Sequence, residues 1–178
     1  EQMESMRFLL SAFVIALLLI GFILMSQFNS VLKPIIIMTS VIMSTVGVLL
    51  GLMVFRMPFG IIMTGVGIMA LAGLVVRNGI LLVEFTDLLR EQGLGLYESV
   101  IEASKTRMTP VILTTLAACM GLIPLAVGLN IDFVALFSEF NGHLYFGGDN
   151  VAFWGPLSWT MIFGLIFGTF LTLVLVPV

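Results

Sequence analysis

The chain has 178 residues, of which 60% are hydrophobic and only 10% charged, and its mean hydropathy is +1.22. A soluble domain carries roughly 25% charged residues, so this composition excludes a water-soluble globular protein. Seven basic against ten acidic residues leave no basic surface for nucleic acid, and one cysteine permits no internal disulfide. Because the first residues lack a basic region and the last ones lie in an apolar run, we expect a membrane-embedded part of a larger protein.

Charged residues divide the chain into uncharged runs whose lengths can be compared with a bilayer. A membrane-spanning helix needs about 20 mostly apolar residues, and a helix satisfies its own backbone hydrogen bonds in lipid. Five runs are long enough. The sequence therefore predicts an all-α membrane protein with transmembrane helices at about residues 8–28, 34–55, 59–87, 108–130 and 156–178.

The connections predict which side of the membrane each end occupies. Residues 88–107 are expected to be a charged linker that includes a short amphipathic helix at 96–106. Lys and Arg residues on the side of this linker outnumber those on the other side four to two, which favours a cytoplasmic linker. Residues 131–155 are then a periplasmic loop, with a turn at 147–150 and a short interfacial helix that includes Phe133, Leu136, Phe137 and Phe140.

Arg77 is a charged residue inside a predicted span, where a charge costs about 2.5–3.5 kcal/mol and usually faces a bundle interior or a watery path. The alternative is that its side chain reaches the nearer interface, about 10 Å away at Glu84. Arg107 precedes the next span, and Thr114 follows seven residues later on nearly the same face. We expect Arg77, Arg107 and Thr114 to form a polar ladder. The alternatives are an interfacial anchor for Arg107 and a bond from Thr114 to its own backbone.

Other residues carry weaker signals. Glu84 and Asp87 share one helical side, which is typical either of a solvated helix end or of a cation or proton site. Glycines four residues apart at 47 and 51, and again at 164 and 168, predict close helix packing. The chain has one His, one Cys and no hydrolase or nucleotide-binding motif, so the sequence predicts no enzyme, no metal site and no cofactor.

Three segments resemble a known family. Residues 73–85, 107–115 and 121–125 are similar to the tenth and eleventh transmembrane helices of resistance-nodulation-division (RND) efflux transporters of the hydrophobe/amphiphile branch. The rest of the chain would then match helices eight, nine and twelve, as part of the C-terminal half of the membrane domain. The resemblance implies a proton-driven antiporter of the bacterial inner membrane. Such a protein is a homotrimer that exports lipophilic or amphiphilic substrates through a periplasmic adaptor and an outer-membrane channel.

The resemblance also implies a proton relay. The family uses two aspartates on the fourth helix, a lysine on the tenth, and an arginine and a threonine on the eleventh; the last three positions align with Arg77, Arg107 and Thr114. Arg in place of Lys stays protonated, which implies a fixed counter-ion instead of a proton carrier. Because the aspartates belong to another part of the transporter, we expect this chain to be inactive by itself. The alternatives are a heavy-metal efflux relative, a protein-export accessory subunit of the same superfamily, and a passive helical membrane scaffold.

Overall fold

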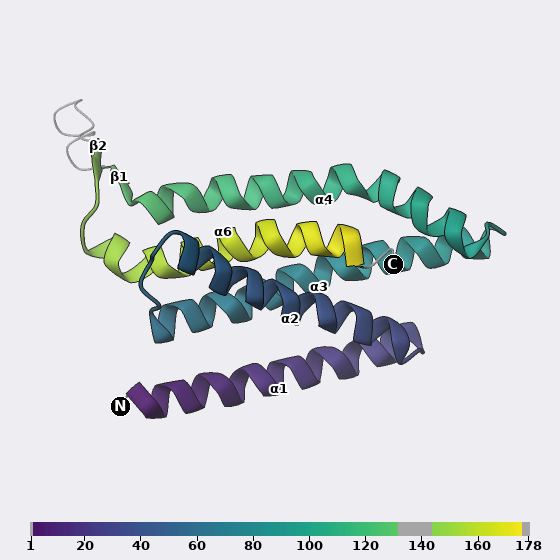
Figure 1. The fold of residues 1–178 in the computed structure, drawn as a ribbon, viewed down its shortest axis with the longest axis horizontal. Coiled ribbons are helices and arrows are strands. Elements are labelled where there is room, and N and C mark those ends of the chain that lie inside the picture. Colours follow the sequence, from purple (N-terminus) through teal and green to yellow (C-terminus); the bar gives the residue numbers. More distant parts are fainter. Residues whose placement is uncertain (1, 132–143, 176–178) are drawn as a thin grey trace.

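The computed structural model describes residues 2–131 and 144–175. Five long helices lie roughly side by side, with successive helices running in opposite directions (Figure 1). Each is long and apolar enough to cross a bilayer, which confirms the predicted all-α membrane fold. Their 23 to 32 residues extend over about 35–48 Å. The helices are α1 (Gln2–Phe28), α2 (Leu32–Val54), α3 (Ile61–Glu91), α4 (Leu96–Val127) and α6 (Asp149–Leu175).

Short connections reverse the chain between the first four helices. Asn29 and Arg56, at the α1–α2 and α2–α3 turns, have left-handed backbone conformations with φ values of 44° and 52°. Gly93 ends α3 at φ 93°, and α4 begins directly after Gly95. Most of the charged residues consequently gather at one end of the bundle, where the α1–α2 and α3–α4 connections lie (Figure 1).

The charged linker differs from its predicted form. Residues 88–91 continue α3, and residues 96–107 form the first turns of α4 without a break before the span. Pro110 lies inside this helix because a proline removes only one backbone donor there, and the remaining hydrogen bonds carry the helix through. Figure 1 shows α4 bending in its first third, as an internal proline is expected to cause.

The segment after α4 also differs from the predicted loop. Two three-residue strands, β1 (Leu129–Ile131) and β2 (Leu144–Phe146), pair in antiparallel fashion. Gly147 and Gly148, both at φ 100°, make the predicted turn, so α6 begins at Asp149 and not at residue 156. The expected interfacial helix around Phe133–Phe140 lies outside the described residues.

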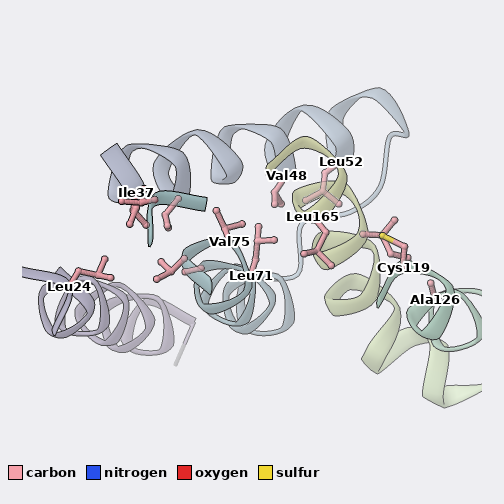
Figure 2. Packing of buried hydrophobic residues seen from close by; sticks show 14 residues of the cluster. Leu24, Ile37, Val48, Leu52, Leu71, Val75, Cys119, Ala126 and Leu165 are labelled. Carbon is pink, nitrogen blue, oxygen red and sulfur yellow. The ribbon is translucent and has the colours of Figure 1, made fainter. Parts of the chain in front are cut away.

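Helix α6 occupies the centre of the bundle and packs against α2, α3 and α4, whereas α1 lies at one edge against α2 and α3 (Figure 1). Side chains of α2, α3 and α6, together with a few from α1 and α4, form one apolar cluster (Figure 2). Figure 2 shows Val48, Leu71, Val75 and Leu165 converging at its centre. Because lipid is as apolar as these side chains, close packing and not water exclusion holds such a cluster together within the bilayer.

The paired glycines predicted to pack closely do so at the α2–α6 interface. A Cβ atom at Gly47 would collide with the ring of Phe167, and one at Gly51 with the ring of Phe163. On the opposing helix, Gly164 leaves room for Leu71 of α3. The small residues therefore act as sockets for large side chains of the neighbouring helices, which allows the helix axes to approach.

Candidate functional site

The polar residues of the candidate site lie between α3 and α4. Arg77 is near the midpoint of the 31-residue α3, in a run that is otherwise apolar apart from its neighbour Asn78. Leu81 and Phe85 follow at four-residue intervals, so Arg77, Leu81 and Phe85 form one ridge along the helix. Within the described residues this ridge borders two adjoining cavities against α4, and Leu81 lines both of them.

The first cavity brings Arg77 and Thr114 together. It has a volume of about 190 Å³ and is closed on one side by Leu165 of α6. The Arg77 side chain is exposed and has no ion pair or hydrogen bond among the described residues. A mid-helix guanidinium in this setting is therefore available to a partner outside this part of the chain. Arg77 and Thr114, which were predicted to lie at the same depth, both line this cavity.

Thr114 makes the local bond expected of a helical threonine. Its Oγ1 donates to the carbonyl oxygen of Val111 at 2.9 Å. The hydroxyl oxygen still has lone pairs free to accept a hydrogen bond. Pro110, which also lines the cavity, has no backbone N–H and leaves the carbonyl oxygen of Thr106 without its usual helical donor. On this wall of the cavity, the Thr114 hydroxyl oxygen can therefore accept a hydrogen bond.

Sequence reasoning missed a second hydroxyl contact at the back of the same cavity. Thr115 lines the cavity, and its Oγ1 lies 2.8 Å from Oγ1 of Thr169 on α6, with both residues buried. The only signal in the sequence was that each threonine interrupts an apolar run. That these two positions face each other follows from the α4–α6 packing, which periodicity does not reveal.

Arg107 lies in the second cavity and not beside Arg77. This cavity, of about 410 Å³, is bordered by Glu84, Asp87 and Glu91 of α3. The guanidinium carbon of Arg107 lies 4.5 Å from the centre of the Phe85 ring, a cation–π geometry. The predicted ladder is therefore divided by the Leu81 side chain into one compartment with Arg77 and Thr114 and another with Arg107.

The two carboxylates considered as a possible cation site have different surroundings. Asp87 accepts a hydrogen bond from Lys33 Nζ at 2.6 Å, and both side chains are about 30% exposed. Glu84 is exposed on the border of the Arg107 cavity. Among the described residues no three His, Cys, Asp or Glu side chains gather as they would around a metal ion. The ion pair ties the start of α2 to the end of α3.

A larger cavity lies at the opposite end of the bundle. It has a volume of about 910 Å³ and is formed by the first turns of α1, α3 and α6. Its walls are mostly apolar, and Glu4 is the charged residue that borders it. Near this end, Trp159 Nε1 donates to the carbonyl oxygen of Ala126 at 3.2 Å, which satisfies one of the free carbonyls of the last turn of α4.

Helices of membrane-spanning length define a polytopic membrane protein, and comparison with known proteins gives its family. Residues 1–131 match the model of the AcrB/AcrD/AcrF family. Multidrug resistance protein MdtC of Edwardsiella ictaluri is 35% identical over 179 residues, and MdtC of Erwinia tasmaniensis is 32% identical over 181 residues. The cobalt-zinc-cadmium resistance protein CzcA of Cupriavidus metallidurans is 30% identical over 179 residues. Each alignment covers 100% of this chain and 15% of the relative.

A solved structure is also similar. The crystal structure of a heavy metal efflux pump has a TM-score of 0.67 and 29% sequence identity, over 90% of this chain and 14% of the other. The chain belongs to the AcrB/AcrD/AcrF family, within the RND efflux transporters. It is a multi-pass protein of the bacterial inner membrane. It spans about 15% of the length of the curated relatives that it matches.

Proposed function

We propose that this chain is part of a proton-driven efflux antiporter and that Arg77, Arg107 and Thr114 belong to its proton relay. The observation that carries the proposal is Arg77 in the middle of the membrane-spanning helix α3, where it shares a cavity with Thr114 and has no counter-ion in the described part of the chain. A charge at that depth is costly unless a partner or water satisfies it. We infer that carboxylates of another part of the transporter supply the partner, as the fourth-helix aspartates do in the family.

The arginine at position 77 favours a particular form of relay. A guanidinium stays protonated, so Arg77 can attract or release a carboxylate but does not itself carry the proton. We propose that acidic partners alternate between pairing with Arg77 and being protonated, while Thr114 and Arg107 line the path to the charged end. Protonation would then change the helix arrangement, driven by about 2.3 kcal/mol per charge per 100 mV of membrane potential.

Substitutions in the full-length transporter test this relay. Arg77→Ala, Arg107→Ala and Thr114→Val are expected to reduce proton-coupled efflux at least tenfold with unchanged abundance in the membrane, because each removes one polar group from the path. Lys105→Ala is the matched control, since Lys105 is exposed on α4 and borders neither relay cavity. Undiminished efflux by the Arg77→Ala protein would refute the relay assignment.

Lipophilic or amphiphilic compounds are the proposed substrates, in line with the multidrug resistance relatives. Metal cations are the second candidate, because CzcA and the heavy metal efflux pump are also similar to this chain. A pump-deficient bacterium that expresses the full-length protein would distinguish them. Tolerance to ethidium supports the first candidate, and tolerance to zinc chloride supports the second. The present chain, reconstituted alone in liposomes, is expected to move neither protons nor substrate.

Assembly with other chains is part of the same proposal. We propose that the full-length protein forms a homotrimer and works with a periplasmic adaptor and an outer-membrane channel. The support is family membership, since this chain carries only membrane helices and their connections in its described part. Cross-linking the full-length protein in membranes tests the proposal, which predicts a product of three subunits. An exclusively monomeric protein would contradict it.

A further inference from the structure

The surroundings of Arg107 are unusual for a cation near acidic residues. Its Nε atom is buried and has no hydrogen-bond partner among the described residues. Its guanidinium carbon lies 4.5 Å from the centre of the Phe85 ring, whereas no ion pair within this part of the chain joins it to Glu84, Asp87 or Glu91. An aromatic face, and not a carboxylate, therefore holds this guanidinium.

A carboxylate and an aromatic ring have different effects on the charge of the Arg107 guanidinium. A carboxylate would neutralise Arg107 and compete with any acidic group arriving from elsewhere. A ring attracts the cation through its quadrupole, fixes its position and leaves its full charge exposed to a partner. Partial burial makes the attraction stronger than it would be in water.

A second contact occupies one of the three carboxylates that border the Arg107 cavity. Asp87 borders the Arg107 cavity but accepts a hydrogen bond from Lys33 of α2 at 2.6 Å. Lys33 is itself near an aromatic ring, with Nζ 5.8 Å from the centre of Phe28. The start of α2 thus neutralises Asp87 from a second polar cavity, which Gln27, Phe28 and Lys33 line together with it.

We propose that Phe85 is a positioning residue that holds Arg107 as an unpaired cation, and that Lys33 supports it by occupying Asp87. This inference rests on the proposed relay role of Arg107. Phe85 lies on the same ridge as Arg77 and Leu81, so the position of the ring is fixed by the helix that carries the central relay arginine. The ring touches the cation and not the transported proton.

Ring variants of Phe85 in the full-length transporter test the inference, with tolerance to ethidium and to zinc chloride as the readouts. Phe85→Leu keeps an apolar side chain but has no π face, and it is expected to lower efflux roughly threefold to tenfold, the range that a partly buried cation–π contact supports. Phe85→Trp provides a stronger π face and is expected to restore efflux to within about twofold of the original protein. Met120→Ala, which trims an exposed apolar side chain of α4 that borders neither relay cavity, is the control and should retain efflux.

Variants of Lys33 and Asp87 supply an independent test of the inference. Lys33→Met frees Asp87 to pair with Arg107 and is expected to lower efflux, whereas adding Asp87→Asn to that variant should restore it. A merely structural role of the ion pair predicts the opposite, because the double variant loses the pair as completely as the single one. All variants are compared at equal abundance in the membrane.

Failure of the inference and failure of the proposed function can be told apart. If Arg107→Ala abolishes efflux while Phe85→Leu retains it, or if Phe85→Trp is as poor as Phe85→Leu, the positioning role is wrong and the relay stands. If Arg107→Ala retains full efflux, or the full-length protein confers tolerance to neither probe, the proposed function fails and this inference with it.

Discussion

The two sides of α3 differ in what they contact. One side packs into the apolar cluster with α2 and α6, where Leu71 and Val75 are almost completely buried. The other side carries Arg77 and Phe85 toward α4 and borders cavities that are open to the outside of the described chain. Close packing therefore fixes the position of the helix. The polar side borders Arg77, which has no hydrogen-bond or ion-pair partner in the described part of the chain, and Arg107, whose Nε atom has no hydrogen-bond partner there.

Substitutions on the two sides of α3 should therefore have separable effects on protein abundance and on transport. Substitutions in the packed side should change how much folded protein exists and leave the transport per molecule unaltered. Substitutions along the cavities should change transport at constant abundance. Three experiments on the full-length protein test this division.

The largest effect is expected at Gly47. Gly47→Leu would place a side chain where the Phe167 ring lies, so α2 and α6 would have to separate. Overpacking of this kind destabilises by about 3 kcal/mol, which should lower the thermal unfolding temperature in detergent and the amount of protein in the membrane. Gly21→Ala is the control, because no atom lies within 4 Å of a Cβ there. Equal stability of the two variants would show that the glycine sockets are not needed.

An intermediate effect is expected from changing the chemistry of Arg77 without changing the packing. Arg77→Lys restores the residue common in the family and keeps the charge, so efflux should stay within about twofold. Arg77→Gln removes the charge and should lower efflux at least tenfold, equivalent to about 1.4 kcal/mol. Both proteins should reach the same abundance as the original, since the side chain is exposed in the described chain. A loss of efflux in both would mean that the guanidinium shape, and not the charge, is required.

The smallest effect is expected at the contact between Thr115 of α4 and Thr169 of α6. Their hydroxyls are 2.8 Å apart and buried, so Thr115→Val and Thr169→Val should each destabilise by about 1 kcal/mol. The double variant should cost less than the sum, with a coupling of about 0.6 kcal/mol, as is typical of hydrogen bonds between membrane helices. Strict additivity in thermal unfolding would show that the two hydroxyls do not stabilise each other.

Much of the membrane topology could be predicted from the distribution of charge. Charged residues interrupt the apolar runs at intervals that a bilayer imposes, so the number of helices follows from counting. The start of α4 was harder to predict, because Arg107 and Pro110 resemble the beginning of a span although the helix begins eleven residues before Arg107. Neither residue breaks a helix whose other backbone groups remain bonded. The preceding helix ends at Glu91, and Gly93, two residues later, has a left-handed backbone.

The candidate site was predictable in its depth and not in its compartments. Counting turns placed Arg77 and Thr114 at the same level, since the rise per residue of a helix is constant. The same counting placed Arg107 on the same face but could not show that Leu81 would separate it from Arg77. Side-chain size and helix rotation decide that separation, and neither is visible in a linear pattern.

The amino-acid order alone predicts that this protein spans a membrane, which residues interrupt the spans, and to which transporter family it is similar. These properties depend on composition and on local order along the chain. The three-dimensional packing of the helices is needed to see that Phe85 covers Arg107, that Lys33 pairs with Asp87 and that Thr115 meets Thr169. Each of these contacts joins residues from different helices, so it depends on how the helices rotate and approach, which the packing of glycines against large side chains sets.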